Sequence, residues 1–302
     1  KKQVRQTFQG RIRVKNALSR SGLPDIDYAF NPYAGCAHGC LYCYAVKFPS
    51  FQGPLKPRFN LAENISRMAA KTRPKLPVML SDTTDPYQPA EAKYMITRRC
   101  LEALIGSGFP ILIVTKSDLV VRDLDLLTRG RVVVSITVTS LDEGFSRFME
   151  SGAPPPFRRL KALRRLSSEG IPTIARIDPI IPGLNDKPED LEHLVRKLKD
   201  CGVRHVTAST LKPVRGFFRR LERVNPKLAE RLKEAYREAV NIVGYNYLPE
   251  EERLKTVETV RRLVLAEGMS FASCRENFSR LNTAICDGTG YLTPQRQLLN
   301  SP

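Results

Sequence analysis

Short apolar segments alternate with longer amphipathic segments along most of the chain. The apolar segments predict six strands, near 29–34, 76–81, 110–115, 131–138, 171–178 and 204–210. The amphipathic segments predict helices near 60–72, 91–106, 120–128, 156–169 and 187–201. Several of these helices end at a glycine, such as Gly106 and Gly202. A repeated order of strand and then helix is typical of a parallel sheet.

The pattern changes after Lys212, where the chain reads as mainly helical and then irregular. Six strand-helix units without a second set predict an α/β fold, a partial (β/α)6 TIM-like barrel rather than the full eight-unit barrel. We therefore divide the chain into an N-terminal basic arm (1–25), the barrel (26–212) and a helical or irregular C-terminal extension (213–302).

Composition narrows the class of protein. A chain of 302 residues, 42% of them hydrophobic, is long enough to bury a substantial core.

No stretch approaches the roughly 18 to 20 uncharged apolar residues of a membrane span, so we expect no membrane association. Seven cysteines, three of them within eight positions, fit metal ligation in a reducing compartment better than a disulfide framework. We expect a cytoplasmic location, since the chain shows no apolar signal segment, and we also expect a monomer.

The charge balance is strongly basic. Lys and Arg number 49 against 31 Asp and Glu, which gives a net charge of +18. Such a charge predicts attraction to a polyanion, and nucleic acid is the first candidate. The alternative is a thermophile-like abundance of charged residues with a basic bias. Residues 1–24 carry seven of the cations and no acidic residue, so they predict a basic surface arm whose partner would be nucleic acid.

Polar residues follow every predicted strand. In a barrel of this kind the carboxyl ends of the strands hold the functional residues, because the loops converge there on a rigid support. The strand ends deliver, in chain order, Cys36, the segment 81–85, Lys116, the segment 137–140, Arg176 with Asp178, and the segment 209–212. These positions are the candidates for the site.

Three cysteines stand in a loop straight after the first predicted strand. Cys36, Cys40 and Cys43 have the spacing C-x3-C-x2-C, with Gly35 and Gly39 in the same loop. A 4Fe-4S cluster normally takes four cysteines, so three of them leave one iron open to a ligand that is not protein. Two alternatives are a zinc site, which needs a fourth ligand such as His38, and three structural thiols.

This motif resembles that of the radical S-adenosylmethionine (SAM) superfamily, in which the open iron is chelated by SAM. Tyr42 matches the aromatic position that lies against the adenine in that superfamily. Within it, the chain is similar to the spore photoproduct lyase-like group, also called DNA repair photolyase-like. The similarity runs over roughly 27–215 and rests on the segments 40–44, 81–91, 115–117 and 177–186.

The resemblance implies a 4Fe-4S cluster and SAM as cofactors, and an electron donor such as ferredoxin or flavodoxin. Cys36, Cys40 and Cys43 would hold the cluster. The cofactor-binding residues that it implies are Tyr42, Ser81, Asp82, Thr83, Thr84, Lys116, Ser135, Thr137, Arg176 and Asp178. The alternatives are local: the segment 81–86 could be an ordinary capped turn, and Lys116 a solvated side chain.

One departure from the group concerns catalysis. Spore photoproduct lyases resemble one another in a cysteine just before the serine of the second-strand motif, which donates hydrogen to the product radical. This chain has Met79 and Leu80 there, which argues against repair of thymine dimers. Tyr42 and Tyr44 remain as redox-active neighbours of the cluster.

Four further cysteines lie outside the loop. The resemblance places Cys274 and Cys286 in a tail that covers the barrel mouth, where either could be a catalytic thiol that faces the substrate. The alternative is that each is a small buried hydrophobe. Cys100 and Cys201 stand inside helical patterns, so we expect both to be buried.

Two basic segments are candidates for phosphate contacts. The residues concerned are Arg158, Arg159, Arg164 and Arg165 on one predicted helix, and Arg219 and Arg220 beside two phenylalanines. Arginine can bridge phosphates, and an exposed Phe217 or Phe218 could stack on an unpaired base. The alternative is an ordinary helix exterior with the phenylalanines in the core.

These observations lead to a hypothesis about function. A 5′-deoxyadenosyl radical, formed by cleavage of SAM at the reduced cluster, would act on RNA or DNA held over the barrel mouth. A second hypothesis is radical modification of a peptide, a protein or a small anionic metabolite. A third, of another class, is a nucleic-acid-binding protein whose cluster is structural or sensing.

Overall fold

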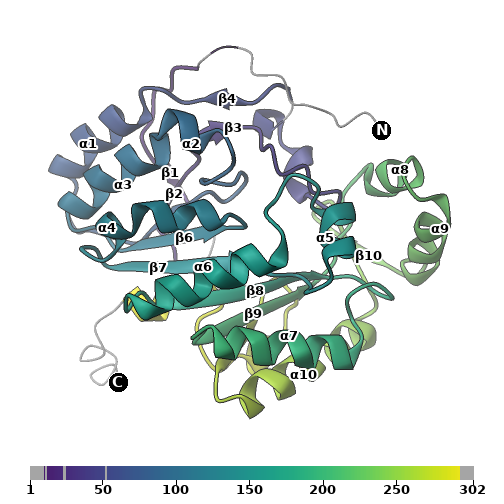
Figure 1. The fold of residues 1–302 in the computed structure, drawn as a ribbon. Coiled ribbons are helices and arrows are strands. Elements are labelled where there is room, and N and C mark those ends of the chain that lie inside the picture. Colours follow the sequence, from purple (N-terminus) through teal and green to yellow (C-terminus); the bar gives the residue numbers. More distant parts are fainter. Residues whose placement is uncertain (1–9, 11, 23–24, 52, 293–302) are drawn as a thin grey trace.

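The computed structural model describes residues 10, 12–22, 25–51 and 53–292. All six predicted strands are present and parallel, as β2 (Tyr28–Phe30), β5 (Val78–Leu80), β6 (Ile111–Thr115), β7 (Val132–Thr137), β8 (Thr173–Ile180) and β9 (His205–Thr210). They are consecutive neighbours in one sheet of order β1-β2-β5-β6-β7-β8-β9-β12 (Figure 1). The α/β fold with a mainly parallel, partial TIM-like barrel is therefore confirmed.

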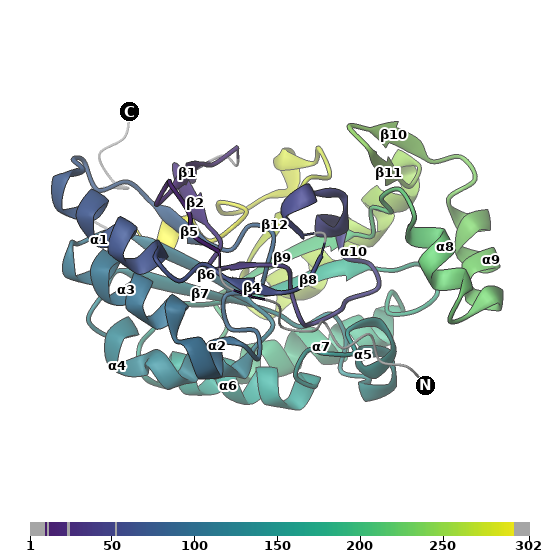
Figure 2. The same ribbon diagram turned by 90° about the horizontal axis from the view of Figure 1, so that it is seen from above.

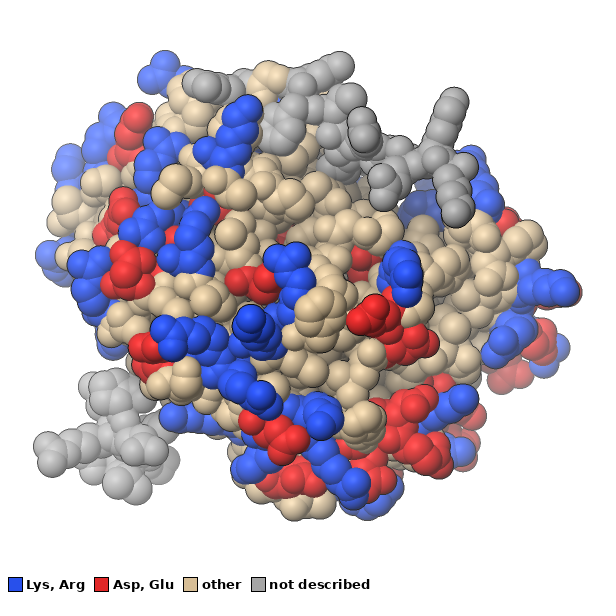
Figure 3. All heavy atoms as spheres, viewed as in Figure 1, with Lys and Arg blue, Asp and Glu red and all other residues tan. Residues whose placement is uncertain are grey.

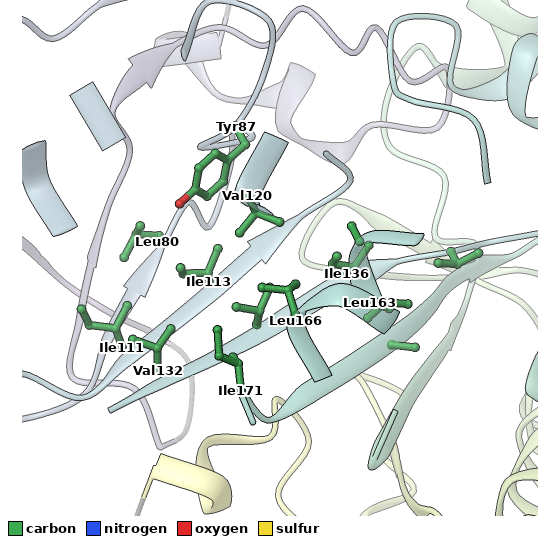
Figure 4. Packing of buried hydrophobic residues seen from close by; sticks show 14 of the residues in the cluster. Leu80, Tyr87, Ile111, Ile113, Val120, Val132, Ile136, Leu163, Leu166 and Ile171 are labelled. Carbon is green, nitrogen blue, oxygen red and sulfur yellow. The ribbon is translucent and has the colours of Figure 1, made fainter. Parts of the chain in front are cut away.

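Helices cover one face of this sheet (Figure 2). They are α1 (Leu61–Lys71), α2 (Glu91–Tyr94), α3 (Ile96–Gly106), α4 (Leu124–Leu127), α6 (Pro156–Ser168), α7 (Pro188–Asp200) and α10 (Glu250–Ala266). α5 (Glu143–Met149) packs in a separate apolar cluster. Alternate strand residues such as Ile113 and Ile136 pack against the helix layer, where Leu163 and Leu166 of α6 meet them (Figure 4). Since side chains alternate along a strand, the residues between them face the barrel interior.

The helix expected over 91–106 is broken into α2 and α3 at Met95, whose φ is 51°. The break lets the buried Glu91 carboxylate cap the second helix, since it accepts hydrogen bonds from the backbone N–H groups of Thr97 (2.9 Å) and Arg98 (3.2 Å). Arg122 lies 2.8 Å from the same carboxylate and balances its charge.

The C-terminal extension is less helical than expected. It contains α8 (Phe217–Glu222), α9 (Pro226–Ala235), α10 (Glu250–Ala266), a hairpin of β10 (Val240–Ile242) and β11 (Tyr245–Tyr247), and the strand β12 (Ser270–Ser273). β12 pairs in parallel with β9, as the seventh parallel strand of the barrel sheet. The prediction of six parallel strands was therefore one too few, because the C-terminal extension adds β12 to the barrel sheet.

The segment 283–292, which we call the tail, runs across the barrel interior. It begins where Thr283 N–H donates to Phe271 O (2.8 Å) and ends in a short 3-10 helix, Thr289–Leu292. Leu292 packs into one cluster with residues near the amino ends of the strands, namely Ile26, Ala29, Met79, Leu112, Val133 and Ile174. The tail thus fills the amino end of the barrel.

Residues 1–9, 11, 23 and 24 of the predicted basic arm lie outside the described residues. Its described part includes β1 (Ser19–Arg20), which is antiparallel to β2. Two more short strands, β3 (Tyr33–Ala34) and β4 (Lys56–Pro57), pair with each other beside the sheet. In the described ranges, no helix is both long and apolar enough to span a membrane.

Candidate functional site

The cysteine loop follows β2 and β3 at the carboxyl end of the sheet. Gln88 anchors it, since its Oε1 accepts from Ala37 N–H (2.8 Å) and its Nε2 donates to Gly35 O (3.1 Å). A second contact to the loop comes from Gly152, whose N–H donates to His38 O (2.9 Å). A Cβ at Gly152 would lie 2.2 Å from Ala37 O, so only glycine permits this approach.

Asp85 ties the loop to the end of β6. Its carboxylate accepts from Thr115 Oγ1 and from Lys116 N–H, both at 2.7 Å, and lies 3.4 Å from His38 Nδ1. Burial lowers the pKa of His38, although Asp85 opposes this shift, so the imidazole is neutral. His38 is therefore a buried loop residue that Asp85 orients.

The three cysteines lie together at this loop, with Cys36 buried and Cys40 and Cys43 half-buried. Among the residues that the structure describes, no group of three His, Cys, Asp or Glu side chains is placed to hold a single metal ion. A mononuclear zinc site therefore gains no support. In a 4Fe-4S cluster each thiolate binds a different iron, so the thiols need not converge on one point.

Burial raises the pKa of all three thiols, that of Cys40 to about 12. Lys116 opposes the shift at Cys40 and Cys43. Buried thiols of this kind become thiolates when a metal supplies the compensating charge. The donor set thus fits a multi-iron cationic group.

A buried network supports the aromatic residue of the loop. Tyr42 OH donates to Glu150 Oε1, which also accepts from Thr139 Oγ1 (3.0 Å). Arg159 Nη2 lies 2.5 Å from Glu150 Oε2. Lys116 Nζ lies 5.5 Å from the centre of the Tyr42 ring. Burial and then Glu150 raise the pKa of Tyr42, so the phenol keeps its proton.

The structure contradicts one predicted phosphate contact. Arg159 is only 1% exposed and donates to Pro154 O and Thr137 O, so it cannot reach a phosphate. The prediction that Arg159 binds nucleic acid was wrong, because this side chain balances the buried Glu150 carboxylate.

The other predicted cations of α6 are exposed, but they lie on the outer helix layer. Arg158 pairs with Asp118 and Arg165 with Glu169, each at 2.7 Å, while Arg164 is exposed. On this face Lys and Arg side chains are interspersed with Asp and Glu (Figure 3). This face is a mixed surface of both signs.

Two serines predicted to bind the cofactor have unsatisfied hydroxyls. The Oγ atoms of Ser81 and Ser135 are buried, and neither has a hydrogen-bond partner. Both stand on interior-facing positions near the carboxyl end of the sheet, on β7 for Ser135 and just after β5 for Ser81. Ser81 also has a φ of 65°, a conformation that non-glycine residues rarely adopt. A buried hydroxyl without a partner is costly unless a ligand satisfies it.

Asp82, Thr83 and Thr84 shape a loop rather than present free groups. Asn31 Nδ2 donates to Asp82 Oδ1 (2.6 Å), and Asn31 Oδ1 accepts from the backbone N–H of Thr83 (3.2 Å) and of Thr84 (3.1 Å). Both threonine hydroxyls also donate to Asn31. Tyr44 OH donates to Asp82 O, which joins this loop to the cysteine loop.

The remaining candidates line β8 and its neighbours. Arg176 Nη2 donates to Asp178 Oδ2 (2.8 Å). Although burial raises it, Arg176 and then Lys212 hold the pKa of Asp178 below its usual value. Cys274 lies beside Arg176, and Thr137 is buried one strand away. As expected, Cys100 and Cys201 are buried.

Sequence reasoning missed three residues that position the site, Asn31, Gln88 and Glu150, while Asp85 stood within the candidate segment 81–85. Gln88 stands within the segment 81–91 that carried the resemblance, and Asn31 precedes Cys36 by five positions, so both side chains were available as a signal. No local sequence signal pointed to Glu150, because its partners Tyr42 and Arg159 come from the cysteine loop and from α6.

A partial parallel barrel with a C-x3-C-x2-C loop after its first strand is the arrangement of a radical SAM enzyme. The radical SAM superfamily model matches residues 30–198. The chain belongs to this superfamily, whose cofactors are a 4Fe-4S cluster and SAM.

The chain is also similar to several relatives and solved structures. The uncharacterized protein Rv2578c of Mycobacterium tuberculosis is 32% identical over 276 residues, which cover 84% of this chain and 79% of that protein. The uncharacterized protein MJ0683 of Methanocaldococcus jannaschii is 30% identical over 193 residues, 63% of this chain and 72% of that protein.

A spore photoproduct lyase complexed with dinucleoside spore photoproduct has a TM-score of 0.71 at 19% identity, over 88% of this chain and 81% of that chain. Streptococcus suis SuiB bound to S-adenosylmethionine has a TM-score of 0.55 at 14% identity, over 82% of this chain and 50% of that chain. These likenesses show the fold.

Proposed function

We propose that Cys36, Cys40 and Cys43 hold the cluster and that SAM lies between this loop and the carboxyl ends of β5, β6 and β7. The observation that carries this proposal is the pair of buried, unpartnered hydroxyls of Ser81 and Ser135. SAM offers amino, carboxylate and ribose groups that would satisfy them.

Lys116 completes the proposed pocket. Its side chain lies over Tyr42 and near Cys40, and within the described ranges no carboxylate forms an ion pair with it. Although burial opposes it, the charges of Cys40 and Glu150 raise the pKa of Lys116, so the ammonium stays protonated. It would bind the carboxylate of SAM, while Tyr42 stacks on the adenine and Thr137, Arg176 and Asp178 form the deeper wall.

The bound cofactors supply a carbon-centred radical, and the protein positions and shields it. Asp85 and Gln88 hold the cysteine loop against the strand ends, so the cluster side of the pocket is rigid. The tail closes the amino end of the interior, which leaves the carboxyl end as the entrance for the substrate.

The test of this proposal is anaerobic reconstitution with iron and sulfide, reduction with dithionite and measurement of 5′-deoxyadenosine formed from SAM. Lys116→Ala should keep its iron but bind SAM more weakly by about 1.5 to 3 kcal/mol, since one charge-assisted contact is lost. Lys161→Ala, on the exposed face of α6, is the matched control. An unchanged SAM affinity in Lys116→Ala would remove this residue from the pocket.

We further propose that the substrate is a nucleic acid that approaches the mouth of the barrel. Cations border this mouth beside the hairpin: Lys47 Nζ lies 3.5 Å and Arg275 Cζ 4.0 Å from the centre of the Tyr245 ring. That ring lies 6.3 Å from the ring of Tyr44. Together with the net charge of +18, these positions support phosphate contacts around the entrance.

The predicted cations of α8 belong to the same border. Arg220 Nη2 donates to Leu41 O (3.3 Å) in the cysteine loop, and Arg219 is exposed. Arg215 is exposed in the segment between β9 and α8. Of the two basic segments, α8 is therefore better placed than α6 to hold a polyanion at the mouth.

Two triple variants of equal charge change test this placement. In the mouth variant Arg215, Arg219 and Arg275 become Glu, and in the α6 variant Lys161, Arg164 and Arg165 become Glu. The mouth variant should weaken RNA or DNA binding and reduce the salt dependence, whose slope is about −0.7 to −0.9 per phosphate contact. The α6 variant should bind like the parent protein.

The reverse result would place the nucleic acid on the helix layer. No binding by the parent protein below about 100 mM salt, where screening is incomplete, would contradict a nucleic-acid substrate. Radical modification of a peptide or a small anion would then be the better hypothesis.

A further inference from the structure

Two cysteines outside the cluster loop, Cys274 and Cys286, both lie against the strand β9. Cys274 directly follows β12, and its backbone N–H donates to Ala208 O (2.9 Å) on β9. Cys286 lies in the tail, where its carbonyl oxygen accepts from Thr207 Oγ1, also on β9. Consecutive residues of β9 therefore fix both cysteines, and their thiols lie within hydrogen-bonding contact.

The tail holds Cys286 in this position through two close contacts. At its start, Thr283 N–H donates to Phe271 O (2.8 Å), while Phe271 N–H donates to Thr283 Oγ1 (2.9 Å). Two residues after Cys286, Gly288 has a φ of 79° and packs so closely that a Cβ there would lie 1.6 Å from Ile174 Cδ1. The sequence thus supplies glycine where the tail must touch the sheet.

The charges around the pair favour one thiolate and one thiol. A hydrogen bond from Cys286 and the nearby Arg176 lower the pKa of Cys274 to about 6, although burial and Asp178 oppose this. The same hydrogen bond and burial raise the pKa of Cys286. His205, the remaining titratable group on β9, is neutral because burial lowers its pKa to about 4. Asp287 is the acidic neighbour on the tail.

We propose that Cys274 and Cys286 form a redox-active dithiol site in the barrel interior that reacts with small disulfides. The Cys274 thiolate attacks one sulfur of a disulfide RSSR, which forms a mixed disulfide and releases RS⁻. Cys286 then loses its proton and attacks the Cys274 sulfur, which releases the second RS⁻ and leaves an intramolecular disulfide. The protein loses two electrons, and RSSR gains them.

The site is more exposed than the other thiols outside the cluster loop. Cys274 and Cys286 are half-buried, whereas Cys100 and Cys201 are buried. Oxidation would also remove the anionic sulfur beside Arg176 and leave Asp178 as its acidic partner. The redox state of the pair would therefore change the charge on the wall of the barrel, whether or not the protein binds nucleic acid.

The test uses the anaerobically reconstituted holoprotein, in which iron protects the cluster cysteines. We treat it with oxidised glutathione, digest it with trypsin without reduction and analyse the peptides by mass spectrometry. The tryptic peptides 263–275 and 281–296 each contain one cysteine of the pair and none of the cluster loop. They should appear linked and separate again after dithiothreitol, while Cys100 and Cys201 stay unmodified.

Two variants separate the chemistry from folding. Cys286→Ala should stop at the mixed disulfide of Cys274 with glutathione. Cys274→Ala should react more slowly, because burial and Asp287 still raise the pKa of the remaining thiol after the Cys274 contact is lost. Melting temperature and iron content should match those of the parent protein. If either cysteine forms a glutathione adduct in the parent protein without closure to the linked peptides, or if neither reacts, the proposal is overturned.

A second readout follows the thiolate directly. In the parent protein, alkylation of Cys274 by iodoacetamide should reach half its maximal rate near pH 6. In Arg176→Gln this midpoint should rise toward the ordinary thiol value of about 8.5, because the guanidinium no longer stabilises the anion. A midpoint that stays near 8.5 in the parent protein would show that Cys274 is an ordinary thiol and would contradict the proposal.

Discussion

The interior of the barrel has two ends of opposite chemistry. At the amino ends of the strands it is filled by apolar side chains, including Met79, Leu112 and Val133, which Leu292 covers. At the carboxyl ends the interior-facing positions carry Ser81 and Ser135, whose hydroxyls lack partners. The amino end packs mainly on its own apolar side chains, although the Oγ1 atom of Thr289 in the tail also lacks a partner, while at the carboxyl end the unpartnered hydroxyls lie at the strand ends. Variants at the two ends should therefore separate stability from cofactor binding.

The largest effect is expected at the carboxyl end. Replacement of Cys36, Cys40 or Cys43 by Ala should abolish the iron–sulfur absorbance and the formation of 5′-deoxyadenosine, because a cluster on three ligands tolerates no loss. Cys201→Ala, at a buried cysteine of the helix layer, is the control and should keep its iron. A triple Ala variant that retained about four irons per chain would contradict the assignment of the ligands.

Arg159 challenges a simple division between the two ends, since it lies near the site yet serves stability. Arg159→Ala should lower the free energy of unfolding by about 3 to 5 kcal/mol, because it leaves the Glu150 charge buried and unpaired. Arg158→Ala, at the exposed neighbour, should change it by less than about 1 kcal/mol. Denaturant titration of both variants measures the difference. Equal stability would mean that Glu150 finds another partner.

Leu292 tests the amino end. Leu292→Ala should lower the free energy of unfolding by about 2 to 5 kcal/mol, since it opens a cavity in the cluster under the sheet. Cofactor binding to the folded protein should stay unchanged, which isothermal titration with SAM would measure. Loss of SAM affinity at full folding would show that the two ends are coupled.

The smallest effect is expected at the unpartnered hydroxyls. Ser135→Ala should leave the free energy of unfolding unchanged or slightly higher, because no hydrogen bond is lost and a buried polar group is removed. Its affinity for SAM should fall by about 0.5 to 1.5 kcal/mol if the hydroxyl binds the cofactor. A clear loss of stability would mean that Ser135 has a structural partner in the free protein.

The strands and the cysteine loop were predictable because their signals are local. Apolar runs define β5 to β9, and the spacing of Cys36, Cys40 and Cys43 is a short motif. The strand β12 escaped notice, since its sequence Ser-Phe-Ala-Ser offers a single bulky apolar residue and its partner lies 65 positions earlier along the chain. Only the pairing with β9 makes it a strand.

The error at Arg159 has a physical reason as well. Pro156, Leu163 and Leu166 form the buried stripe of α6, and Arg159 stands on this stripe at helical spacing. The periodicity therefore indicated a buried position, whereas the run of neighbouring arginines suggested an exposed one. Glu150, the partner that makes this burial possible, lies at the end of α5 and not on α6. Helical periodicity could decide the direction of this side chain, but not what neutralises it.

The apolar cluster that contains Ile26 and Leu292 has a consequence for the synthesis of the protein. These two residues belong to one apolar cluster although almost the whole described chain separates them. A ribosome adds about 5 to 20 residues per second, so roughly 13 to 53 s pass between their appearances. During that time the cysteine loop and the first strands are already outside the ribosome, while Met79, Leu112 and Val133 still lack their cover. Until translation reaches Leu292, the nascent chain exposes an aggregation-prone apolar surface that chaperones would have to shield.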